Sequence, residues 1–279
     1  MIKVEAPGPG DPGRTSALHT VLGQDKEAIV LDLKADAGRE LALQLAMQSD
    51  VLIENFATGV MDRLGLGAET LHTHHPSLVY VSASGMGRTG PQARAVAYGT
   101  LLQCFSGFAE LNMPAGRDPR VGMAWLDPMC GLLLALIAGA GVHAKHATGA
   151  GTRVDFSMVE AMLWTMSEPL LQAQRHPDRT GAGESAGMYR CAGDDAWVAL
   201  TPRDNRERAA LASLCGQSGE NSTLADAIGA WTYALNADDA AARCRAHGIP
   251  AEVVCDALAL VSNEHLGARR FWEPSQDAV

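Results

Sequence analysis

The chain has 279 residues, of which 47% are hydrophobic, and it carries a formal net charge of −10. This length and composition favour a folded protein with two domains and exclude a disordered chain. The negative charge excludes a general nucleic-acid-binding protein, which needs a basic face. The six cysteines are scattered without a C-x-x-C pair. We therefore expect a cytoplasmic protein with reduced thiols, without disulfides or a bound metal.

Neither the N-terminus nor the most apolar stretch predicts a membrane protein. Residues 1–5 (MIKVE) lack the apolar core of a signal peptide. The apolar residues 132–142 are followed by His143, Lys145 and His146, so they predict a buried helix and no membrane span.

The first part of the chain alternates β-prone runs with helical patterns. Strands are predicted at residues 2–4, 29–33, 51–53, 78–81 and 153–156. Helices are predicted after Asp36 as N-cap, around residues 60–64, and from Asp127 to a glycine cap near residues 148–151. A capping box at residues 157–160 predicts one more helix, which carries Met162, Met166 and Leu170. This alternation indicates an α/β fold, a parallel sheet with helices on both faces.

The pattern changes after Gln174. Residues 176–187 are polar and glycine-rich, as in a linker or a loop that closes over a site. Residues 188–191 and 197–200 flank a turn and predict a hairpin, and another β element is expected near residues 251–254. We therefore expect a Rossmann-like large domain at residues 1–175 and a smaller α+β domain at residues 188–279.

Three motif matches are interpreted as coincidental. Residues 8–13 fit G-x-G-x-x-G, but two prolines lie within them and no amphipathic helix follows. Residues 183–187 fit the G-x-S-x-G nucleophile elbow, yet a loop precedes the serine and a strand is predicted after it. The histidines at positions 72, 74 and 75 cannot all face one metal ion from a single helix or turn.

Asp127 is the principal candidate for chemistry. It precedes Pro128 and the most apolar helix pattern of the chain, so it has two interpretations. In the first, Asp127 is a structural N-cap and Pro128 is the first helical residue. In the second, it is a carboxylate nucleophile, which the positive helix end stabilises in its charged form by about 0.3–1 kcal/mol.

Several short segments favour the second interpretation because of their order and spacing. The most specific is residues 50–61 (DVLIENFATGVM). The others are residues 1–14, 32–39, 80–91, 127, 148–157, 187–199 and 248–251. Together they resemble the class III CoA-transferases, the family that includes the formyl-CoA:oxalate and carnitine CoA-transferases. In that family a nucleophilic aspartate lies just ahead of a glycine-containing apolar helix, and Asp127 matches its position.

The resemblance implies a reaction and a binding site. Asp127 would accept an acyl group from an acyl-CoA as a mixed anhydride and then carry CoA as a thioester. It also implies an interlocked homodimer, with no metal. The residues expected along CoA are Arg14, Asn55, Phe56, Ala57, Ala83, Ser84, Gly85, Arg94 and Tyr98. For Arg94 a plain surface charge is an equally good interpretation.

Two departures from the family leave alternatives open. Family members begin with a further strand and helix and end with a segment that returns to the large domain. Relative to them, this chain is shortened at both ends, so its large domain is expected to be incomplete. An inactive remnant that binds CoA or a partner chain is one alternative. An α-methylacyl-CoA racemase is the other, but the histidine it needs near residues 97–99 is missing.

Overall fold

The computed structural model describes residues 1–8, 10, 17–111, 121–175, 185–216 and 223–272. The chain forms two compact units, Met1–Arg179 and Thr180–Val279.

The described strands of the first unit form two parallel sheets. β1 (Ile2–Glu5) pairs with β2 (Glu27–Val30), and β4 (Val79–Ser84) lies between β3 (Val51–Glu54) and β5 (Thr152–Ser157). The predicted parallel α/β arrangement is thus confirmed, although the strands lie in two sheets and not in one. The helices of this unit are α1 (Ala17–Leu22), α2 (Asp36–Met47), α3 (Val60–Arg63), α4 (Ala68–His74), α5 (Gly99–Phe105), α6 (Phe108–Leu111), α7 (Leu126–Thr148), α8 (Met158–Thr165) and α9 (Ser167–Arg175).

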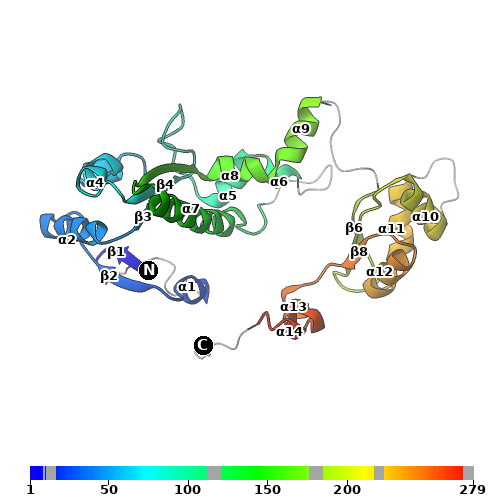
Figure 1. Cartoon of the computed structure of the whole chain (residues 1–279). Helices are drawn as coiled ribbons and strands as arrows, with labels where there is room; N and C mark the ends of the chain where they lie inside the picture. The colour runs from blue at the N-terminus through cyan, green and yellow to red at the C-terminus, as the bar shows by residue number, and fades with distance from the viewer. Residues whose placement is uncertain (9, 11–16, 112–120, 176–184, 217–222, 273–279) are drawn as a thin grey trace. The chain divides into compact units, whose positions relative to one another are not determined.

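Helices cover both faces of the central strand β4, as predicted. Tyr80 packs with Leu71 of α4 in one core cluster. The neighbouring Val79 points to the other face, because successive side chains of a strand alternate, and there it meets α7 (Figure 1). A Cβ on Gly141 of α7 would lie 2.5 Å from Val79 Cγ1. Glycine therefore lets the α7 backbone approach the sheet closely.

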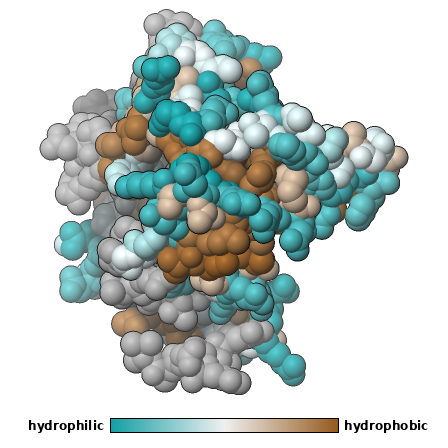
Figure 2. Space-filling model, turned by 90° about the vertical axis from the view of Figure 1, so that its left-hand side faces the viewer, coloured by the Kyte–Doolittle hydropathy of each residue, from teal (hydrophilic) through white to brown (hydrophobic). Residues whose placement is uncertain are grey.

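α7 is less buried than its sequence predicts. One face packs against β4, α5 and α8, but Leu132 and Leu136 are 74% and 69% exposed. The prediction of a buried helix is wrong for this second face, because no described residue covers it. The space-filling view shows hydrophobic side chains gathered on the face turned to the viewer (Figure 2). Within the described ranges α7 alone is long and apolar enough to cross a membrane, a test that core helices also pass.

Local details differ from the sequence prediction at some helix ends. Asp36 does not cap α2, because the helix begins at Asp36 and Ala35 holds the N-cap position. Ser157 does cap α8, where its hydroxyl accepts a bond from the Glu160 N–H at 3.4 Å. The single helix expected through Leu170 is instead divided between α8 and α9.

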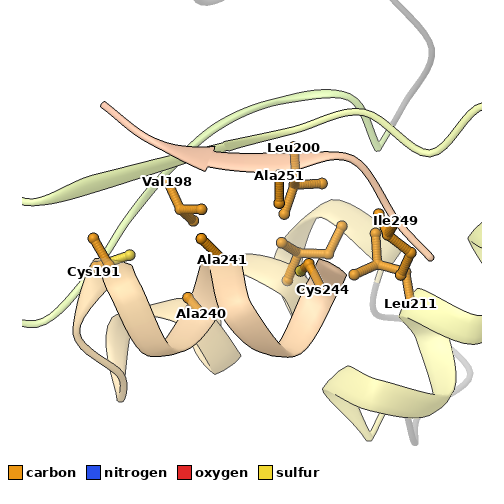
Figure 3. Close-up of a cluster of buried hydrophobic side chains, with 11 residues drawn as sticks. Cys191, Val198, Leu200, Leu211, Ala240, Ala241, Cys244, Ile249 and Ala251 are labelled. Carbon is orange, nitrogen blue, oxygen red and sulfur yellow. The ribbon is translucent and has the colours of Figure 1, made fainter. Parts of the chain in front are cut away.

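The second unit has an antiparallel sheet covered by helices. β6 (Gly187–Arg190) and β7 (Trp197–Leu200) form the predicted hairpin, and β8 (Ala251–Val253) pairs with β7. Figure 3 shows Val198 and Leu200 of the sheet facing Ala241 and Cys244 of α12. The helices here are α10 (Asn205–Cys215), α11 (Leu224–Tyr233), α12 (Ala237–Ala246), α13 (Ala257–Val261) and α14 (Glu264–Ala268).

Candidate functional site

Asp127 lies in the first turn of α7. The helix begins at Leu126, and Trp125 occupies the N-cap position without a side-chain capping bond. The prediction that Asp127 is the N-cap and Pro128 the first helical residue is therefore wrong, because they are the second and third. Pro128 still suits this turn, since first-turn N–H groups have no intrahelical acceptor and proline has no N–H to leave unpaired. The Asp127 side chain is consequently not used in capping.

The Asp127 carboxyl group packs against Gly99, the first residue of α5. A Cβ on Gly99 would lie 2.6 Å from both Oδ1 and Cγ of Asp127, and closer still to Oδ2. Any larger residue at position 99 would therefore occupy the space of the carboxylate. The carboxylate reaches the backbone at the start of α5 only because a glycine is present.

Loss of solvent raises the pKa of Asp127 above its ordinary value. The residue as a whole is exposed, but the packing at Gly99 removes water from one side of its carboxyl group. The hydrogen bond from its own backbone N–H acts in the opposite direction and is the smaller effect. Desolvation therefore acts against the charged form, which the helix end is expected to favour. A carboxylate that is less well solvated is a more reactive nucleophile.

The segment that leads into Asp127 is held by Gln103, a residue that the sequence analysis did not identify. Its side chain is fully buried. Its Nε2 donates to the carbonyl oxygens of Val121 and Met123 at 3.2 and 3.1 Å, and its Oε1 accepts from the Leu126 N–H at 3.2 Å. No sequence motif pointed to this residue, because its partners lie 18 to 23 positions away.

The loops after β3 and β4 lie at the carboxyl edge of the parallel sheet, where ligands bind in open α/β folds. Arg88 links them. Its guanidinium donates to the buried Glu54 at 2.9 Å, to the carbonyl oxygen of Phe56 at 2.6 Å and to that of Ala83 at 3.0 Å. The same group donates to Ser82 Oγ at 2.7 Å and to Thr58 Oγ1 at 3.3 Å. All five N–H groups of an arginine are thereby used within the protein.

This arrangement brings most of the predicted CoA residues to one edge. Asn55, Phe56 and Ala57 follow β3 and are exposed. Ala83 and Ser84 end β4, and Gly85 follows them, where its Cβ position would lie 3.4 Å from Leu102 of α5. The Ser84 hydroxyl is buried and finds no hydrogen-bond partner in the described part of the chain. An unpaired buried hydroxyl at the carboxyl edge of the sheet is consistent with a site where a polar ligand supplies the missing hydrogen bond.

The other predicted residues have different surroundings. Tyr98 is 82% exposed and precedes Gly99, next to Asp127. Arg94 is also exposed and follows Ala93, whose carbonyl accepts a bond from Thr58 Oγ1 at 2.5 Å. Arg14 lies outside the described residues, as do glycines 181 and 183 of the predicted closing loop.

The three motif matches interpreted as coincidental have local structural roles where the structure describes them. His72 and His75 contact the carbonyl oxygens of Leu78 and Ser49, at 2.9 and 3.1 Å. Ser185 is buried and is followed by strand β6, as the sequence predicted, whereas a nucleophile elbow needs a helix after the serine. Most of residues 8–13 lie outside the described ranges.

The comparisons with known proteins identify the family. The model of CoA-transferase family III matches residues 1–279, and the chain belongs to this family of enzymes, which use acyl-CoA substrates. It is 39% identical over 181 residues to acetyl-CoA:oxalate CoA-transferase of Acetobacter aceti, a match covering 61% of this chain and 46% of the relative. It is 30% identical over 302 residues to succinyl-CoA–D-citramalate CoA-transferase of Chloroflexus aurantiacus, covering 97% of this chain and 75% of the relative.

Solved structures show the same fold. The crystal structure of a CAIB/BAIF family protein from Brucella suis matches with a TM-score of 0.79 at 23% identity, over 96% of this chain and 80% of that one. Rv3272 from M. tuberculosis matches with the same TM-score at 22% identity, over 96% and 78%. The matched part of the Acetobacter aceti enzyme is less than half of its length.

Proposed function

We propose that this chain transfers CoA from an acyl-CoA to a carboxylic acid, with Asp127 as the covalent nucleophile. The observation that carries the proposal is the placement of the Asp127 carboxylate. It is free of capping, packs against Gly99, and lies on a chain that belongs to CoA-transferase family III. The names of the two relatives above describe CoA transfer to oxalate and to D-citramalate, which supports the reaction class.

The chemistry balances without a metal or a nucleotide triphosphate. A carboxylate oxygen of Asp127 attacks the thioester carbonyl, the C–S bond breaks, and CoA leaves as a thiolate from a mixed anhydride. The thiolate attacks the aspartyl carbonyl, releases the first acid as a carboxylate and forms an aspartyl-CoA thioester. The acceptor carboxylate then repeats both steps in reverse order, which restores Asp127. Each difficult exchange is divided into two easier ones.

CoA is proposed to lie along the carboxyl edge of the parallel strands. The exposed loop at Asn55, Phe56 and Ala57 would pass near the nucleotide, and Ala83, Ser84 and Gly85 near the pantetheine arm. Tyr98 would lie beside the thioester because it precedes Gly99. Arg14 and Arg94 are the proposed cations for the CoA phosphates, since guanidinium groups match phosphate geometry.

The remaining assignments complete the proposal. Residues 1–175 are the CoA-binding large domain and residues 188–279 the small domain, joined by the glycine-rich residues 176–187. The enzyme acts as a homodimer in the cytoplasm. The exposed apolar side chains of Met123 and Trp125 beside Asp127 favour an acid larger than formate or oxalate.

Mass spectrometry of the chain incubated with a series of acyl-CoAs tests the proposal. The peptide that contains Asp127 should gain the mass of CoA, and Asp127→Asn should abolish both this adduct and the exchange of CoA between two acids. A wild-type protein that binds CoA without forming the adduct would contradict the proposal and indicate a remnant. Exchange of the substrate's α-proton without an adduct would indicate a racemase.

A further inference from the structure

One face of the short helix α5 contacts both the nucleophile and the segment leading into it. Gly99 and Gln103 are four residues apart, so they lie one above the other on this face. Gly99 packs against the Asp127 carboxylate. Gln103 makes its three hydrogen bonds to Val121, Met123 and Leu126. A displacement of α5 relative to α7 would therefore change both the packing of the carboxylate and the hydrogen bonds of the segment before it.

Gln103 supplies the capping bond that α7 lacks. Trp125 makes no side-chain capping bond. The Leu126 N–H has no acceptor within its own helix, because it belongs to the first turn. The Gln103 Oε1 accepts from that N–H, one residue before Asp127. The two N–H groups of the same amide are bound to carbonyl oxygens of Val121 and Met123, in the segment that leads into the helix. One buried amide thus fixes both the path and the start of the helix.

We propose that Gln103 is a positioning residue of the transferase site, which sets where the Asp127 carboxylate lies without touching the substrate. This inference rests on the proposed function of Asp127. Without the Gln103 side chain the first turn of α7 would fray, and the Asp127 carboxylate would sample positions away from the thioester. A misplacement of about 1 Å in a catalytic group can reduce a rate about 100-fold. CoA binding should be nearly unchanged, because Gln103 is buried and its side chain bonds only to this segment.

Two variants test this on the full chain. Gln103→Met keeps the volume but removes all three hydrogen bonds. Gln103→Glu keeps the acceptor for the Leu126 N–H but loses donors to the two carbonyls. Leu71→Ala, in a separate core cluster of the same unit, is the matched control for lost stability alone. The measurements are the CoA dissociation constant, the single-turnover rate of CoA adduct formation on Asp127, and hydrogen exchange of residues 121–130.

We expect Gln103→Met to slow adduct formation 10- to 100-fold with a CoA dissociation constant within twofold of wild type, and Gln103→Glu to be intermediate. Equal adduct rates in Gln103→Met and wild type would overturn the proposal. Hydrogen exchange tests the role of Gln103 separately from the transferase function. This test remains valid even if the wild type forms no adduct, a result that would refute the transferase function. Gln103→Met should speed exchange at Leu126, whereas Leu71→Ala should not. If Gln103→Met does not fold, the wild-type Leu126 N–H still decides: fast exchange there refutes the inference.

Discussion

Replacing Gly99 by alanine is the most direct test of the geometry at Asp127. The new Cβ would lie 2.6 Å from Oδ1 and Cγ of Asp127, whereas ordinary contacts begin at 3.4 Å. The carboxylate must therefore move by at least 0.8 Å, the difference between these distances. A shift of about 1 Å costs a catalytic group about 100-fold in rate, or ~2.7 kcal/mol of barrier.

The same substitution elsewhere provides the control. Gly139 lies within α7, and a Cβ there would meet open space. Gly139→Ala should stabilise the chain by about 0.5–1 kcal/mol, because alanine restricts the unfolded backbone more than glycine does.

The assay is the single-turnover rate of CoA adduct formation, with the free energy of unfolding measured by urea titration. Gly99→Ala should lose about 100-fold in rate, and Gly139→Ala should lose none. Retention of the full rate by a folded Gly99→Ala protein would refute the reasoning that the carboxylate reacts from its position against α5.

Three further predictions concern charge. Adduct formation should fall on acidification through a pKa above the ordinary aspartate value of about 3.9, because Asp127 must be ionised and desolvation raises its pKa. The folded state then holds this proton more tightly than the unfolded chain, so stability falls as pH rises between the two pKa values. Asp127→Asn should therefore have a higher Tm than wild type at neutral pH, but not near pH 3. The same Tm for the variant and the wild type at both pH values would contradict the desolvation of Asp127. Arg88→Met should cost about 3–5 kcal/mol in urea titrations, because it leaves a buried carboxylate unpaired, whereas exposed Arg94→Met should stay within about 0.5 kcal/mol. Similar losses in the two arginine variants would argue against the buried ion pair.

Strand positions and the end of α7 were predicted well from local sequence, although the N-caps of α2 and α7 were not. The helix that starts beside Asp127 ends at Thr148, where Gly149 adopts the expected left-handed conformation. Strands β3, β4 and β5 were found close to their predicted positions because apolar runs bounded by turns define them. The order and register in which these strands pair could not be predicted from the sequence, since they depend on contacts between distant segments.

The supports of the site could not be predicted for the same reason. Gln103 lies in an apolar pattern and resembles an ordinary helix residue until its partners at positions 121–126 are seen. Arg88 lies in the loop after β4, where an exposed charge is the usual interpretation, yet its guanidinium bonds to residues up to 34 positions away. Asp127 was identified by family pattern, but its place as second helical residue follows from tertiary contacts of the segment before it, such as the hydrogen bonds to Gln103.

All five guanidinium N–H groups of Arg88 are already hydrogen-bonded within the protein, and this restricts how the carboxyl edge of the sheet can recognise an anion. A guanidinium attracts phosphate by its charge, but directional recognition needs N–H groups left over for the phosphate oxygens. Here the neighbouring Glu54 neutralises the charge, and the protein's own acceptors occupy every N–H. Discrimination between coenzymes with and without a particular phosphate must therefore come from groups other than this guanidinium.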